Sequence, residues 1–128
     1  MADAAVRRSV SLPAAAWLEP PLSRLIFRGD APARAAAAQA FGVELPSTAC
    51  HAATAGGRAA LWLGPDEHLL LAPDGATSSL QTAIASALGS QAHSLVDVSH
   101  RQVGFKVHGP HAAWLLESQC PLPLNLRD

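Results

Sequence analysis

Three residues in the C-terminal half of the chain, Asp97, Ser99 and His100, are of the types that form the triad of nucleophilic hydrolases. In such a triad the histidine takes the serine proton while the aspartate orients the histidine. In an extended strand Asp97 and Ser99 share one face and His100 points to the other, so this spacing does not build the relay. The sequence also lacks the Gly-x-Ser-x-Gly pattern of a nucleophile elbow. We therefore predict that these residues satisfy a turn at a strand end.

Metal binding is the second chemistry that the residue types suggest. The six histidines are His51, His68, His93, His100, His108 and His111. None of them forms a His-x-x-x-His pair on a helix, and His108 and His111 straddle a Gly-Pro turn without a nearby cysteine or carboxylate. We predict structural or solvent-facing histidines and no metal ion.

Nucleotide and nucleic-acid sites are not indicated either. The Gly56-Gly57 pair lies in a loop resembling a hairpin and Gly104 stands alone in a strand, so neither opens a helix as a phosphate site requires. The tryptophans, Trp17, Trp62 and Trp114, have no interleaved basic residues and are expected in core or contact positions. The Asp66-Glu67 pair is expected to be solvated on a turn. The residues thus predict no catalytic, cofactor-binding or metal-binding group.

Composition limits the class of protein. The chain has 128 residues, of which 49% are hydrophobic and 15% charged, with a net charge of −1, as in a soluble globular protein. This balance argues against nucleic-acid and membrane partners. The Arg7-Arg8 pair is followed by prolines and a glutamate instead of an apolar signal core, so we expect a cytoplasmic protein. Cys50 and Cys120 are accordingly expected to be reduced thiols.

The elements that must position these residues follow from periodicity and turn signals. Residues 1–21 predict an irregular N-terminal arm, and residues 22–128 predict a single α+β domain with a mostly antiparallel sheet and helices on one face. The expected order after the arm is β-α-β-β-β-α-β-β-α. Asp30 is placed to cap the first helix and Gly42 to end it. The strands at 59–63 and 68–72 are apolar at nearly every position, which indicates a sheet covered on both faces.

An internal repeat is the strongest pattern in the chain. The stretches from Arg24 to Leu45 and from Ser94 onward each carry a β-rich run, a glycine, a proline within three residues and an apolar helix. Gly29 and Gly109 lie 80 positions apart (109 − 29), which predicts a duplicated α/β unit. The first repeat is expected at about 24–92, and a partial, truncated second repeat at about 93–128. Within the second, two short strands joined by a tight turn are expected to lead into the helix.

Four segments occur in a fixed order along the chain: Trp62-Leu63-Gly64-Pro65-Asp66-Glu67, Leu69-Leu70-Leu71, Asp97-Val98-Ser99-His100-Arg101 and Lys106-Val107-His108-Gly109-Pro110. Taken in this order they resemble the family of the gamma subunit of heterotetrameric sarcosine oxidase, with a similarity that extends from about Arg24 to Asp128. Related segments occur in folate-dependent aminomethyltransferases of glycine cleavage. Family members continue for several more strands and a helix, and they commonly carry an aromatic residue at the place of His68.

The resemblance implies a fold like the folate-binding domain of aminomethyltransferases, built from two related α/β halves. It further implies a non-catalytic structural subunit of a complex that oxidatively demethylates sarcosine to glycine, with tetrahydrofolate as one-carbon acceptor. FAD, FMN, NAD and tetrahydrofolate are then expected on partner subunits and none on this chain. The implied partners are the alpha, beta and delta subunits, and an unpaired sheet edge would pair with another chain or promote self-association.

Two further readings follow from the same residues. The runner-up is a stand-alone folate-dependent aminomethyl or one-carbon transferase, which would need a carboxylate over a pterin-sized pocket, with Asp97 or Glu117 as candidates. A third is a remnant whose α/β unit survives as a self-associating module. For the leading hypothesis, the polar residues Asp97, Ser99, His100 and Arg101 are the expected contact patch for a partner.

Overall fold

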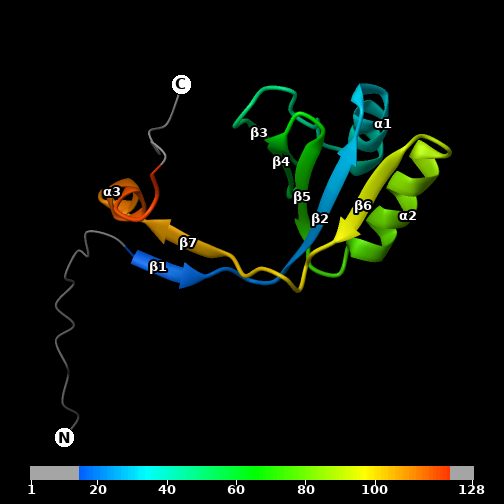
Figure 1. Cartoon of the computed structure of the whole chain (residues 1–128). Coiled ribbons are helices and arrows are strands. Elements are labelled where there is room, and N and C mark those ends of the chain that lie inside the picture. The colour runs from blue at the N-terminus through cyan, green and yellow to red at the C-terminus, as the bar shows by residue number, and fades with distance from the viewer. Residues whose placement is uncertain (1–14, 122–128) are drawn as a thin grey trace, which may run out of the picture. The chain divides into compact units, whose positions relative to one another are not determined.

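The computed structural model describes residues 15–121 and divides the chain into two units (Figure 1). The central unit is continuous, from Pro20 to Val103. The terminal unit brings together residues 15–19 and 104–121.

The central unit is an antiparallel sheet with two helices. Its elements are β2 (Leu22–Gly29), α1 (Ala31–Phe41), β3 (Ala52–Ala55), β4 (Arg58–Gly64), β5 (Glu67–Pro73), α2 (Thr77–Leu88) and β6 (His93–Asp97). The strands lie in the order β3-β4-β5-β2-β6, and every neighbouring pair is antiparallel. This arrangement confirms the predicted antiparallel sheet and the predicted order of these elements.

Helix α1 begins and ends where its local sequence predicts. The Asp30 carboxylate accepts a hydrogen bond of 3.0 Å from the N–H of Ala33, which satisfies one of the free donors of the first turn. Pro32 fits that turn because its missing N–H would have no partner there. Gly42 ends the helix with φ of 78°, a conformation that glycine adopts without steric strain.

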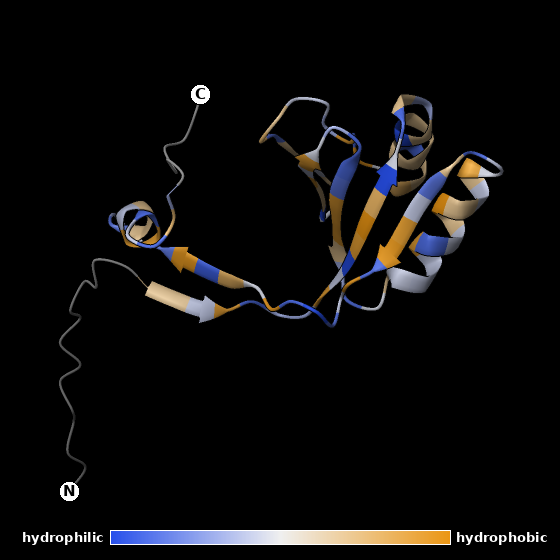
Figure 2. Ribbon diagram, viewed as in Figure 1, coloured by the Kyte–Doolittle hydropathy of each residue, from blue (hydrophilic) through white to orange (hydrophobic). Residues whose placement is uncertain are grey.

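The core lies between one face of the sheet and both helices. Along β2 the side chains alternate, so Leu25 and Phe27 point to the helices, and both are almost fully buried. Phe27 sits in register between His68 of β5 and Leu95 of β6. The helices contribute the buried residues Ala33, Ala37, Phe41, Leu80, Ile84 and Leu88. Figure 2 shows hydrophobic residues along β2 and β6 and along the helices.

The terminal unit consists of β1 (Ala15–Leu18), β7 (Phe105–His108) and α3 (Ala112–Glu117). Strands β1 and β7 form an antiparallel two-stranded sheet. None of the residues of α3 is buried, and Trp114, Phe105 and Leu18 are at least 60% exposed. A two-stranded sheet of this kind is marginally stable in water without a further layer. No helix between residues 15 and 121 combines the length and apolar character needed to cross a membrane.

Two predictions about these elements are wrong. Residues 15–18, expected within an irregular arm, form strand β1, because β7 supplies backbone hydrogen-bonding partners from far along the chain. Residues 1–14 of that arm lie outside the described residues. Strands β6 and β7 are not joined by a tight turn and do not pair, since β6 pairs with β2 and β7 with β1.

Candidate functional site

The end of strand β6 holds the polar residues that the sequence singled out. The Asp97 carboxylate Oδ1 accepts a hydrogen bond of 2.6 Å from the Ser99 hydroxyl and one of 2.9 Å from the Ser99 backbone N–H. An aspartate that binds the backbone two residues later forms a local turn. The Ser99 hydroxyl is therefore bonded to the Asp97 carboxylate, and the two hydrogen bonds stabilise the turn.

The same serine ties the turn to the neighbouring strand. Its hydroxyl oxygen accepts a hydrogen bond of 2.9 Å from the backbone N–H of Arg24, and the N–H of Val98 donates to the Arg24 carbonyl at 2.9 Å. The Arg24 guanidinium, on a side chain only 7% exposed, donates to the Ser99 carbonyl at 3.5 Å. The Thr77 hydroxyl lies 3.4 Å from that of Ser99. Ser99 thus links the ends of β2 and β6 to the start of α2.

Hydrogen bonding changes the acidity of the aspartate in this turn. The bond from the Ser99 hydroxyl, followed by that from the Ser99 N–H, lowers the pKa of Asp97 below its ordinary value of 3.8. Desolvation opposes this shift, and the positive potential of His100, the smallest of these causes, acts in the same direction as the hydrogen bonds. The ionised carboxylate is the form that fits the turn.

The lowered pKa of Asp97 predicts how stability depends on pH. A carboxyl whose pKa is lower in the folded state stabilises the fold above its unfolded pKa, and that contribution is lost as the pH falls through the folded pKa. We expect the difference in unfolding free energy between the wild type and Asp97→Asn to shrink steadily as pH falls from about 6 to about 2. Urea unfolding at a series of pH values measures this difference. A difference that stays constant over that range would contradict the prediction.

The other two residues of the expected contact patch, His100 and Arg101, lie exposed in the turn. The backbone N–H of Arg101 donates to the Val98 carbonyl at 3.0 Å, so the turn is closed by the main chain as well. The structure therefore brings all four residues into one turn, with Asp97 and Ser99 bonded to each other. The side chains of His100 and Arg101 are the exposed part of this turn.

The histidines and the carboxylate pair are dispersed. His68 lies in the core, His51 in the loop before β3, and His93 in β6. The His108 ring centroid is 6.5 Å from that of Trp17. Within residues 15–121 no three histidine, cysteine, aspartate or glutamate side chains gather as a metal ion would need.

Asp66, one of the two carboxylates of the expected solvated pair, forms a salt bridge of 3.0 Å with Arg28 on the surface. Both side chains are more than half exposed, so the bridge adds at most about 1 kcal/mol to stability. The two cysteines, Cys50 and Cys120, are both free thiols.

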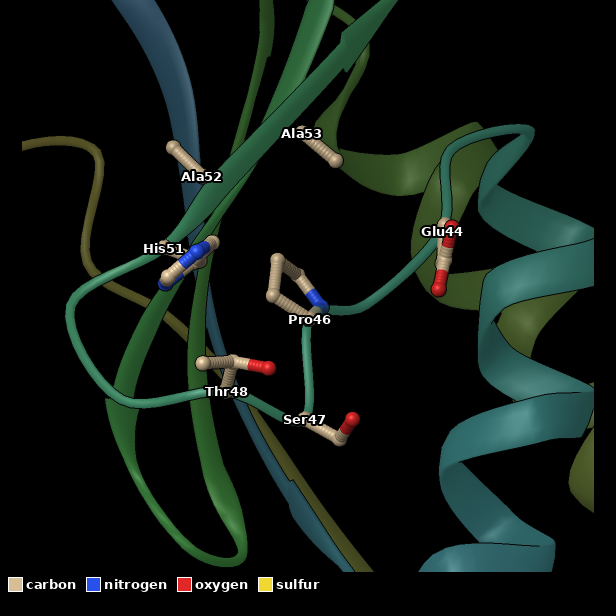
Figure 3. Close-up of a pocket in the computed structure, with 7 residues that line it drawn as sticks. All are labelled: Glu44, Pro46, Ser47, Thr48, His51, Ala52 and Ala53. Carbon is tan, nitrogen blue, oxygen red and sulfur yellow. The ribbon is translucent and has the colours of Figure 1, made fainter. Parts of the chain in front are cut away.

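A small polar pocket opens beside the loop that follows α1 (Figure 3). Its lining consists of Glu44, Pro46, Ser47, Thr48, His51, Ala52 and Ala53. The polar groups of this lining are one carboxylate, two hydroxyls and one imidazole. Its volume, about 190 Å³, is below the ~300 Å³ from which ligand pockets usually start.

Sequence reasoning missed the role of His68, which anchors this pocket loop. The His68 side chain is fully buried, and its Nε2 lies 2.7 Å from the carbonyl oxygen of Pro46. Since that oxygen can only accept, Nε2 carries the proton and donates. Nδ1 is left without a partner among the described residues. The available signal was the alternation in β5, which places His68 on the same face as the buried Leu70 and Ala72.

The fold defines the class of protein, a mixed α/β chain with antiparallel sheets. The hydrogen-bonded polar residues at the end of β6, Asp97 and Ser99, form a structural turn. A sequence model of the sarcosine oxidase gamma subunit family matches residues 28–120. The chain belongs to this family.

Curated relatives agree with the family assignment. The chain is 39% identical over 94 residues to a sarcosine oxidase subunit gamma from Arthrobacter sp. and 38% identical over 94 residues to one from Corynebacterium sp. strain P-1. Each match covers 73% of this chain and 45% of the relative. The chain thus spans less than half the length of these relatives.

A solved structure supports the same relationship. The chain is similar to a chain of the heterotetrameric sarcosine oxidase from Corynebacterium sp. U-96, solved in complex with pyrrole 2-carboxylate, with a TM-score of 0.79 and 32% sequence identity. The similarity covers 88% of this chain and 58% of that one. This confirms the mixed α/β architecture with antiparallel sheets.

Proposed function

We propose that this chain is a non-catalytic structural subunit of a sarcosine oxidase complex. The observation that carries the proposal is the family match over residues 28–120, together with the similarity to a chain of a heterotetrameric sarcosine oxidase. The complex would oxidatively demethylate sarcosine to glycine, with tetrahydrofolate as one-carbon acceptor, in the cytoplasm. Its partners would be the alpha, beta and delta subunits.

In this proposal FAD, FMN, NAD and tetrahydrofolate reside on the partner subunits, with the tetrahydrofolate site on alpha. Asp97 and Ser99 are hydrogen-bonded to each other, and the Ser99 hydroxyl also accepts a hydrogen bond from the Arg24 N–H. These hydrogen bonds support a structural role for Asp97 and Ser99 and not a catalytic one.

The proposal extends to the organisation of the chain. We infer a duplicated α/β fold like the folate-binding domain of aminomethyltransferases, with a first repeat at about 24–92 and part of a second at about 93–128. The support is that the order strand, glycine, helix occurs at β2–Gly29–α1 and again at β7–Gly109–α3. Strand β6 pairs on one side only, with β2, so its outer edge is a candidate for pairing with another chain or for self-association.

Co-expression tests the proposed function. When this chain carries an affinity tag and is produced with candidate alpha, beta and delta chains, we expect it to capture an assembly with flavin absorbance that oxidises sarcosine. The physical reason is that a subunit surface buried in the complex stays bound through purification. If the other chains assemble and turn over sarcosine normally while this chain remains separate, the proposal is wrong.

The contact patch supplies variants for the same assay. The double variant His100→Ala/Arg101→Ala is expected to capture less of the assembly, because both side chains are exposed in the turn and neither holds the fold together. Arg34→Ala on α1 is the control, since it also removes one positive charge from the central unit. Equal capture by the control and the double variant would exclude the turn as the contact.

A further inference from the structure

Two buried side-chain nitrogens of the central unit have no hydrogen-bond partner among the described residues, Nε1 of Trp62 and Nδ1 of His68. The two residues come from β4 and β5 and lie directly opposite each other in register. Because side chains alternate along a strand, both share the sheet face of Ala60 and Leu70, which are buried in the core. The two nitrogens therefore belong to neighbouring side chains on the core side of the sheet.

The two nitrogens are complementary as hydrogen-bonding groups. Nε1 of a tryptophan carries a hydrogen and can only donate. His68 Nε2 donates to the Pro46 carbonyl oxygen at 2.7 Å, so Nδ1 of the neutral ring can only accept. No direct hydrogen bond joins Trp62 Nε1 to His68 Nδ1. A buried donor and a buried acceptor left unpaired both destabilise a fold, so one group that accepts from the first and donates to the second would satisfy both.

The spacing of the two side chains fits a single water molecule in this role. Residues directly opposite each other in an antiparallel pair have Cβ atoms about 4.5–5.5 Å apart. A water oxygen about 2.9 Å from each nitrogen spans roughly 4.7 Å between them. Water both accepts and donates over this span, and buried waters in proteins bind where two to four polar groups converge.

The pairing of β4 with β5 becomes irregular directly after this pair. Gly64 pairs with Glu67, which leaves Leu63 without an opposite residue in the register. Bulges of this kind bend a strand and redirect its side chains. The backbone N–H of Trp62 still donates to the His51 carbonyl at 3.0 Å, which keeps this end of β4 beside the loop before β3. The two unpartnered nitrogens thus lie at the irregular end of the hairpin and not in its regular middle.

We propose that one buried water molecule bridges Trp62 Nε1 and His68 Nδ1. The water accepts a hydrogen bond from the indole and donates one to the imidazole, whose Nε2–H donates in turn to the Pro46 carbonyl. All donors in this chain of hydrogen bonds point from β4 towards the loop after α1, so each bond polarises the next. The bridge thereby connects Trp62 to the loop that lines the pocket in Figure 3. The proposal concerns the isolated chain and does not depend on the proposed function.

Nuclear magnetic resonance of the full chain, labelled with a nitrogen isotope, tests the proposal. The indole N–H signals are assigned with Trp17→Phe, Trp62→Phe and Trp114→Phe, each of which removes one signal. We expect a nuclear Overhauser contact between the Trp62 indole proton and a long-lived water, slow exchange of that proton, and a His68 ring protonated at Nε2 alone. Trp114 is 69% exposed, so its indole proton is the control and should exchange quickly with bulk water.

A scalar coupling across a direct hydrogen bond between Trp62 Nε1 and His68 Nδ1 would overturn the proposal, because the two groups would then satisfy each other without water. Absence of a water contact at the Trp62 indole proton, or a His68 ring protonated at Nδ1, would overturn it as well. These signals are measured on the wild-type chain. If Trp62→Phe does not fold, the other two variants assign the remaining signal to Trp62.

A double-mutant cycle followed by urea unfolding tests the coupling of the two side chains. Trp62→Phe should lower the equilibrium constant for folding by about fivefold or more, because it leaves the buried acceptor of His68 without the indole donor of the bridge. In a His68→Phe background the same change should have a clearly smaller effect, since no buried acceptor remains there. If His68→Phe does not fold, His68→Leu takes its place.

Trp114→Phe is the matched control for the cycle, because it makes the same chemical change at an exposed position. It should change the equilibrium constant for folding by no more than about twofold in either background. Equal effects of Trp62→Phe in the two backgrounds would contradict the bridge, because the indole would then contribute through packing alone.

Discussion

Replacing Phe27 by alanine is expected to lower the free energy of unfolding by about 3–5 kcal/mol. Phe27 is 0% exposed and lies on the central strand β2, between strands β5 and β6 and beneath the helices. The loss combines the transfer free energy of the ring with the cavity that the packed surroundings cannot fill. Since small domains are stable by only about 5–15 kcal/mol, this substitution should remove a large fraction of the total stability.

Urea unfolding followed by circular dichroism measures the Phe27→Ala effect. Phe105→Ala is the matched control, because Phe105 also lies on a strand but is 66% exposed. The free energy of unfolding of Phe105→Ala should stay within about 0.5 kcal/mol of the wild-type value, as for other surface positions. Similar losses for the two variants would mean that the core is not where the structure places it.

The second large effect is expected at Gly29, where strand β2 meets helix α1. A Cβ atom added there would lie 2.8 Å from Cζ of Phe27 and 2.9 Å from Cβ of Ala33. Ala33 belongs to the buried side of α1, so relief requires movement of the helix backbone as well as of the ring. We expect Gly29→Ala to destabilise the protein by about 1–3 kcal/mol, the usual range for overpacking.

Gly64→Ala is the control for this substitution. Gly64 also lies at a strand end, but a Cβ there meets only Cβ of Glu67, at an ordinary distance of 3.6 Å. Its stability should change by less than about 0.5 kcal/mol, or rise slightly because alanine restricts the unfolded chain. Both variants are compared by urea unfolding. A stable Gly29→Ala protein would contradict the close packing of α1 on β2.

Local signals account for the parts of the fold that were predicted correctly. Asp30 and Gly42 act on N–H and C=O groups within one helical turn, so their effect can be read directly from the sequence. The order of strands and helices in the central unit follows from periodicity over similarly short windows. The resemblance to the gamma subunit family was carried by short segments in a fixed order, and the family match confirms it.

The candidate site was only partly predictable. The spacing of Asp97, Ser99 and His100 argued against a proton relay, and the observed turn has the expected local bond between Asp97 and Ser99. The hydrogen bond from the Arg24 N–H to the Ser99 hydroxyl joins residues 75 positions apart, and no pattern in the sequence predicts it. The same holds for the bond from His68 to Pro46, which depends on where the loop after α1 lies.

The sequence alone predicts a mixed α/β chain that resembles the gamma subunit family, with a capped first helix and a sheet covered on both faces. Only the tertiary structure decided that β7 pairs with β1, that β6 pairs with β2, and that α1 and α2 both pack on the core with the same face of the sheet. The physical reason is the separation along the chain over which each interaction acts. Caps and periodicity act between neighbours along the chain, whereas strand pairing is chosen by surfaces that meet only after distant segments have come together.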